Sequence, residues 1–157
     1  MPSILSNPCK YALQALAHLA KREKEGPIPL REVAEEEGIP ASFLAKVLQQ
    51  LAREKLLRSA KGPGGGFTFR RPPSEIKIRE IVTIIDGADS LEACIMGSQT
   101  CAERKNDCPL HEAWKSIQDR IELLMEETSL ADLAHGGPKS TVLRTIGGRL
   151  RRGSRRK

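Results

Sequence analysis

The chain has 157 residues, a net charge of +6 and 39% hydrophobic residues, which is typical of one folded domain with appendages and unlike a disordered chain. No apolar run approaches the roughly 20 residues of a membrane span, and the N-terminus lacks a signal-peptide pattern, so we expect a cytoplasmic protein without a membrane partner. The charge is uneven: residues 1–73 carry +5, residues 74–138 carry −7 and residues 139–157 carry +8. Basic segments attract polyanions such as DNA, although a solvated surface explains the same pattern.

The first third of the chain predicts three helices. The first begins at Asn7 and Pro8, residue types favoured at an N-cap and at the first helical position. A short helix over residues 30–37 and a longer amphipathic helix over residues 40–55 follow, separated by a glycine-containing turn. This is the helix-turn-helix pattern, whose second helix can enter the major groove of DNA.

The solvent-facing side of that longer helix is polar. Its residue types are those that reach phosphates and base edges in DNA complexes. A helical hairpin with a solvated face remains the alternative interpretation of this segment alone. The candidate DNA contacts on this helix are Ser42, Lys46, Gln49 and Gln50.

A β-hairpin follows directly. Residues 56–60 and 67–70 predict two strands, and residues 61–66 predict a tight turn because four of these six residues are glycine. A hairpin directly after a helix-turn-helix is a wing, and glycine lets its backbone approach a phosphate or a minor groove. The candidate wing contacts are Arg58, Lys61, Gly64 and Gly65. We therefore expect a mainly α fold with a small β-hairpin wing, in which residues 1–87 form a winged helix-turn-helix domain.

The rest of the chain predicts a helix over residues 77–86, a cysteine-containing loop over residues 88–108, a long helix over residues 109–134 and a basic, disordered tail over residues 135–157. The long helix is expected to mediate dimerisation, because a stripe with heptad spacing usually packs against another helix. Packing within the same chain is the alternative. The tail is either a DNA-binding arm or an aid to solubility. The stripe consists of Leu110, Trp114, Ile117, Ile121 and Leu124.

Three cysteines, Cys94, Cys101 and Cys108, lie within fifteen residues, and His111 follows three residues after the last. In a reducing compartment such clustering indicates metal or redox chemistry rather than disulfides. Three thiolates and an imidazole can bind zinc or an iron–sulfur cluster. Gaps of six residues favour a cluster, because structural zinc sites prefer ligands two to four residues apart. Zinc and unliganded, redox-switching thiols remain alternatives.

Enzyme chemistry is not indicated. The sequence contains no Ser/His/acid set, no phosphate loop and no paired carboxylates in an apolar setting. A metal-stabilised interaction protein is an alternative of another class, but a docking module has no need of a glycine-rich hairpin flanked by basic residues.

Together these residues resemble the Rrf-type winged-helix transcription regulators, which include IscR-like iron–sulfur cluster regulators and NsrR-like nitric-oxide sensors. The resemblance covers about residues 4–134. It rests on residues 10–13, the wing over residues 58–67, the three cysteines and residues 128–133. It implies a bacterial homodimer that binds a palindromic DNA operator as a repressor, with an affinity controlled by a cluster that senses redox, nitric oxide or iron–sulfur status.

The resemblance also implies a fourth ligand for the cluster. His111 matches the ligand of the IscR-like members, and a [2Fe-2S] cluster is favoured over [4Fe-4S]. In NsrR-like members an acidic residue before the first-helix tyrosine serves instead, and Lys10 occupies that position here. Cys9, one residue earlier, is an alternative ligand reaching across the dimer.

Overall fold

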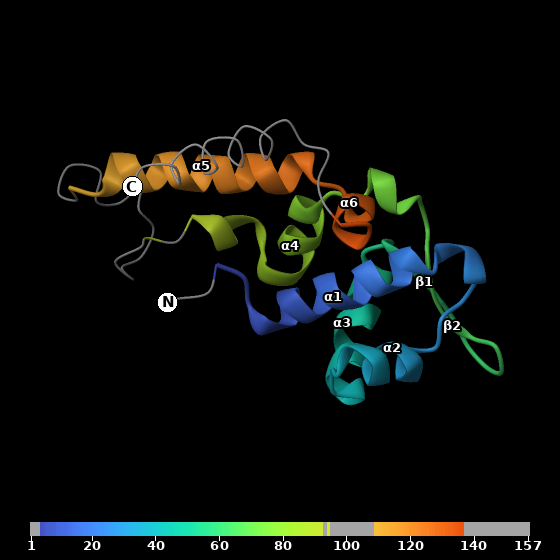
Figure 1. Cartoon of the computed structure of the whole chain (residues 1–157). Helices are drawn as coiled ribbons and strands as arrows, with labels where there is room; N and C mark the ends of the chain where they lie inside the picture. Colours follow the sequence, from blue (N-terminus) through green and yellow to red (C-terminus); the bar gives the residue numbers. More distant parts are fainter. Residues whose placement is uncertain (1–3, 93, 95–108, 137–157) are drawn as a thin grey trace, which may run out of the picture.

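The fold was obtained as a computed structural model, which describes residues 4–92, 94 and 109–136 (Figure 1). The predicted fold class is confirmed: the described residues are mostly helical, with one two-stranded hairpin. In chain order the elements are α1 (Asn7–Lys21), η1 (Glu23–Glu25), α2 (Leu30–Glu37), α3 (Ala41–Arg53), β1 (Leu57–Ala60), β2 (Gly66–Phe69), η2 (Pro73–Glu75), α4 (Ile78–Asp86), η3 (Ala88–Leu91), α5 (His111–Glu127) and α6 (Leu130–Ala134).

Helix α1 begins one residue earlier than predicted. Its N-cap is Ser6 rather than Asn7, and the Ser6 hydroxyl accepts a hydrogen bond from the backbone N–H of Cys9 at 3.1 Å. The backbone N–H of Ser6 donates to the carboxylate of Asp86 at 3.0 Å. The beginning of α1 is therefore attached to the end of α4, eighty residues along the chain.

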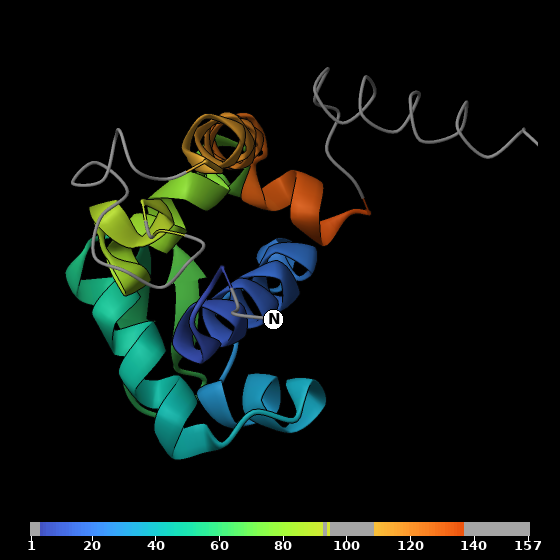
Figure 2. The ribbon, with the colours of Figure 1, turned by 90° about the vertical axis from the view of Figure 1, so that its left-hand side faces the viewer.

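The core surrounds α1, which lies between the α2–α3 pair and α5 (Figures 1 and 2). Helix α2 ends at Gly38, whose φ of 65° is left-handed, as expected for a glycine that terminates a helix. Helix α3 contributes its apolar side to the core, with Leu44, Leu48 and Leu51 fully buried. This burial leaves the opposite side of α3 directed at solvent.

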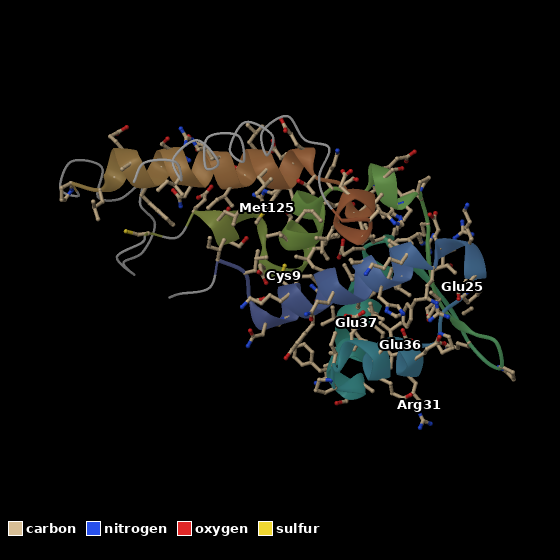
Figure 3. All side chains as sticks on the ribbon, viewed as in Figure 1. Cys9, Glu25, Arg31, Glu36, Glu37 and Met125 are labelled. Carbon is tan, nitrogen blue, oxygen red and sulfur yellow. The ribbon has the colours of Figure 1, made fainter. Side chains whose placement is uncertain are left out.

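A buried histidine connects α1 to α2. His18 Nδ1 lies 3.0 Å from a carboxylate oxygen of Glu37, and Nε2 lies 3.5 Å from one of Glu36. Figure 3 shows both glutamates on the side of α2 that faces α1. The helix-turn-helix is thus joined to the central helix by polar contacts as well as by apolar packing.

The wing is an antiparallel pair in which Leu57 lies opposite Phe69 and Ala60 opposite Gly66. The hairpin is joined to the body because Phe67 also pairs with Ile28, donating its N–H to the Ile28 carbonyl at 2.9 Å. A Cβ at Gly66 would lie 2.2 Å from that carbonyl oxygen. Glycine is required at Gly66 because two backbone segments meet there.

Helix α5 lies along one edge of the molecule, and the short helix α6 returns the chain to α1 (Figure 1). Of α5, only Gln118 is buried, although Met125 packs against the core from the side that faces α4 (Figure 3). Leu130 and Ala134 of α6 are buried, so the end of the predicted dimerisation segment belongs to the core of the body. None of the described helices has the length and apolar character needed to cross a membrane.

Candidate nucleic-acid interface and cysteine segment

Three of the four predicted DNA contacts on α3 share one exposed face. Ser42, Lys46 and Gln49 are spaced by four and three residues, which places them on the same side of a helix, and all three are exposed. They lie opposite the side that packs into the core. The arrangement presents a hydroxyl, an ammonium group and a carboxamide to solvent along α3.

The fourth predicted contact, Gln50, lies in a different environment. It is half-buried, and its Nε2 donates a hydrogen bond to the backbone carbonyl of Ile84 on α4 at 2.8 Å. The structure therefore places the amide N–H of Gln50 between two helices of the protein, while Gln49 beside it faces solvent.

The wing exposes most of its predicted contacts. Arg58, Lys61 and Gly64 are exposed, and Gly65 is half-buried. The Gly65 N–H donates to the Gly62 carbonyl at 2.9 Å, and a Cβ at Gly65 would lie 2.3 Å from the Ala60 carbonyl oxygen. The tight turn that these glycines permit leaves the ammonium group of Lys61 and the backbone of Gly64 accessible at the tip.

Two arginines that follow the wing have contacts within the chain. Arg70 donates Nε to the Leu57 carbonyl at 3.1 Å and so braces the hairpin. Arg71 forms an ion pair with Glu80 on α4 and donates to the Glu75 carbonyl at 3.0 Å. Arg70 therefore stabilises the hairpin itself, and Arg71 connects the chain after the hairpin to η2 and α4.

Two of the four predicted cluster ligands belong to the described residues. Cys94 is half-buried and lies three residues after η3, and His111 is half-buried and is the first residue of α5. Cys101 and Cys108 lie outside the described residues, as do most of the predicted loop and tail. Among residues 4–92, 94 and 109–136, no three potential metal ligands gather in one place.

Polar side chains that the sequence did not identify join η3, which precedes Cys94, to α5, which begins at His111. Gln118 of α5 donates Nε2 to the Leu91 carbonyl of η3 at 2.6 Å, and both residues are buried. Arg79 of α4 donates to the Ala88 carbonyl at 2.8 Å and pairs with Glu122 of α5 at 3.2 Å. The sequence held one indication of this contact, a glutamine on an otherwise apolar side of α5. The thiol of Cys94, three residues after η3, and the imidazole of His111, at the start of α5, are donor types that suit an iron–sulfur or a zinc group.

Cys9 belongs to the core. It has no exposed surface, and burial, together with the neighbouring Asp86 carboxylate, raises the pKa of its thiol to about 12. Figure 3 shows its sulfur between α1 and α4. The thiol is therefore neutral at physiological pH and directed into its own protomer, which does not favour a role as a ligand for a partner's cluster.

Comparisons with known proteins agree with this architecture. The Rrf2 family, described as an iron-dependent transcriptional regulator, matches residues 5–136. A protein of Aquifex aeolicus named as an HTH-type transcriptional regulator is 34% identical over 131 residues, which are 83% of this chain and 90% of that protein. The HTH-type transcriptional regulator IscR of Serratia proteamaculans is 30% identical over 131 residues, covering 83% of this chain and 79% of that protein.

Solved structures show the same fold. CymR of B. subtilis, the global cysteine regulator, has a TM-score of 0.69 and 25% identity over 85% of this chain and 97% of that one. The oxidized form of Staphylococcus aureus CymR has a TM-score of 0.65 and 26% identity over 83% and 95%. With a family match across most of its length and a winged helix-turn-helix body, the chain belongs to the Rrf2 family of DNA-binding transcription regulators, and is not an enzyme.

Proposed function

We propose that this regulator binds its operator with an affinity set by an iron–sulfur cluster held by Cys94, Cys101, Cys108 and His111. The observation that carries the proposal is the buried hydrogen bond from Gln118 to Leu91, which joins the element before Cys94 to the helix that begins at His111. The family description as iron-dependent and the likeness to IscR support it.

The residues have distinct roles in this proposal. Thiolates bind the iron of such clusters, and a histidine can replace one of them, so the set of three cysteines and His111 favours [2Fe-2S]. When bound, the group supplies a redox-sensitive centre whose binding is coupled to the order of its ligand segment. Cys94 connects that segment to η3 and α4, and His111 connects it to α5. His111 is the labile ligand, because an imidazole can be protonated or displaced.

DNA is contacted by two surfaces in this proposal. Ser42, Lys46 and Gln49 on α3 enter the major groove, where they meet base edges and phosphates. Arg58, Lys61 and the glycine backbone at Gly64 and Gly65 contact phosphates or the adjacent minor groove. The amide N–H of Gln50 is engaged with the Ile84 carbonyl, so Gln50 holds α3 to α4 beside this DNA-contacting face.

The protein acts as a homodimer in this proposal. The predicted heptad stripe of α5 is partly uncovered in the single chain, since Leu110 is 48% and Ile117 is 47% exposed. A second copy of α5 would cover it. A two-fold dimer places two winged helices on DNA, so the operator is expected to be an imperfect palindrome, and occupying it represses transcription.

A second candidate function shares the fold and uses the cysteines without a cluster. Its specific support is the oxidized form of CymR, whose structure is similar to this one. In this alternative Cys94, Cys101 and Cys108 act as redox-switched thiols or bind zinc. Cys9 is not a candidate for such a switch, because reactive cysteines have lowered pKa values and the pKa of Cys9 is raised.

Anaerobic purification followed by absorption spectroscopy and analysis of iron, sulfide and zinc tests the proposal. We expect iron and sulfide with visible absorption in the wild type and in Cys9→Ala, the control cysteine variant. Cys101→Ala should lose the absorption and alter DNA binding, whereas His111→Ala should keep a cluster with a shifted spectrum. Zinc without iron, or metal-free thiols, would favour the alternative, and a Cys101→Ala variant that binds iron and DNA like the wild type would contradict the proposal.

A further inference from the structure

The end of α4 and the element that follows it form a junction between three parts of the protein. Over only eight residues, 84–91, the chain accepts hydrogen bonds from α3, from the N-cap of α1, from α4 itself and from α5. Cys94 lies three residues beyond this junction. The bonds are Gln50 to the Ile84 carbonyl at 2.8 Å, Ser6 to the Asp86 carboxylate at 3.0 Å, Arg79 to the Ala88 carbonyl at 2.8 Å and Gln118 to the Leu91 carbonyl at 2.6 Å.

The bond from Gln50 connects this junction to the DNA-reading helix. Ile84 lies in the last turn of α4, where the final four carbonyls of a helix have no intrahelical donor. The side chain of Gln50 supplies a donor to the Ile84 carbonyl. A shift of the α4 terminus relative to α3 would break this bond, so Gln50 couples the position of one helix to that of the other.

We propose that Gln50 is a positioning residue that transmits the state of the cysteine segment to α3. The proposal rests on the proposed function, in which the thiolates control DNA affinity. Binding at Cys94 constrains residues 84–91 from their C-terminal side, and Gln50 holds α3 to the same residues. Ser42, Lys46 and Gln49 then keep one orientation relative to the wing in the metal-loaded protein and adopt others when the metal is removed.

The expected size of the effect follows from the strength of one hydrogen bond. An ordinary intramolecular bond shifts an equilibrium by about 2- to 10-fold. Coupling between two linked sites typically changes an affinity by about 5- to 150-fold. Loss of the Gln50 bond should therefore remove a part of the coupling between metal binding and DNA affinity, without abolishing DNA binding.

The test compares Gln50→Met with Gln49→Met, its exposed neighbour on the same helix. Methionine keeps the length and packing of the glutamine side chain but donates no hydrogen bond. For each protein we would measure the dissociation constant for a palindromic duplex selected from a random pool by the wild type, anaerobically, in the metal-loaded and the chelator-treated forms. The readout is the ratio of the two constants, together with the melting temperature of each form.

We expect Gln50→Met to reduce that ratio by about 2- to 10-fold, and Gln49→Met to weaken binding in both forms while leaving the ratio unchanged. Gln50→Glu, which has the same length but cannot donate when ionised, should behave like Gln50→Met and provides a second variant if the first fails to fold. If both Gln50 variants show the same ratio as the wild type, the role proposed for Gln50 is overturned, and the proposed function is unaffected. A ratio of one in the wild type itself would overturn the proposed function, and with it this inference.

Discussion

Helices α1 and α5 have similar lengths, 15 and 17 residues, but very different surroundings. Seven residues of α1 are buried, and most of them are apolar. In α5 the single buried residue is Gln118, while Ile117 and Leu123 are 47% and 42% exposed. Isolated helices of this length are marginally stable in water. Helix α1 is stabilised by apolar packing within its own chain, whereas α5 is attached to its own chain mainly through Gln118 and Arg79, and in the proposed dimer a second copy covers its apolar stripe. The contrast separates the residues that fold the single chain from those that we propose to join two copies.

Removing a side chain from the core around α1 should give the largest effect on stability. Leu48→Ala should lower the free energy of unfolding by about 2–5 kcal/mol, because it removes a fully buried side chain and leaves a cavity. Leu123→Ala on α5 should change that free energy by less than about 0.5 kcal/mol. Denaturant titration measures both, and equal losses would contradict the distinction between the two helices.

Charging the uncovered stripe should act on association instead. Ile117→Asp should raise the dimer dissociation constant by about 100-fold or more, because association would bury an unpaired carboxylate. Leu123→Asp is the matched control, since Leu123 is exposed on a different side of α5. Analytical ultracentrifugation checks both variants. A wild type that already sediments as a monomer at micromolar concentration would rule out the dimer.

The intrachain contact of α5 should be detectable separately. Gln118→Met should lower the free energy of unfolding by about 1–3 kcal/mol, because it leaves the Leu91 carbonyl without its buried donor. Lys115→Met is the control, since it removes an exposed ion pair with Asp119, and exposed ion pairs contribute little to stability. If the two variants lose equal stability, Gln118 does not hold α5 to η3.

The smallest effect concerns the buried thiol of α1 and appears only at alkaline pH. The pKa of Cys9 is raised from 9.0 to about 12 in the folded protein, so above pH 9 the unfolded chain releases a proton that the folded chain retains. Stability from this group is complete below pH 9 and falls as the pH rises toward 12, by about 1 kcal/mol per pH unit. Unfolding titrations at pH 8 and 10.5 should show a steeper decline for the wild type than for Cys9→Ala. Parallel declines would contradict the burial of a neutral thiol.

Local signals in the sequence were sufficient to predict most helices and strands of the body. Helix α2 ends at Gly38, in the glycine-containing turn that was expected after residue 37, and the second strand of the wing falls at Gly66–Phe69, close to the predicted residues 67–70. The N-cap of α1 could not be predicted from neighbouring residues, because serine and asparagine both cap helices. The distant contact with Asp86 favours Ser6 over Asn7. Ile28 and Phe67 form an isolated bridge of one residue on each side. A single residue has no alternating pattern, so the sequence could not reveal this pairing. Helix α6 was missed as a separate element, although Ser129 and Asp132 form a capping box that the sequence contains.

The candidate site was less accessible from the sequence. The exposed face of Ser42, Lys46 and Gln49 follows from helical spacing alone. The bonds made by Gln50 and Gln118 could not be predicted, because their acceptors are backbone carbonyls, which any residue type provides. The assignment of Cys94 and His111 as ligands stays a prediction.

The affinity of the wild-type protein for its selected duplex, measured anaerobically before and after iron is removed by a chelator, tests most directly whether the cysteine segment controls the DNA-reading surface. We expect iron removal to change the dissociation constant by about 5- to 150-fold and expect no such change in Cys101→Ala. Equal affinities of the iron-loaded and iron-free wild type would contradict control of DNA binding by this segment.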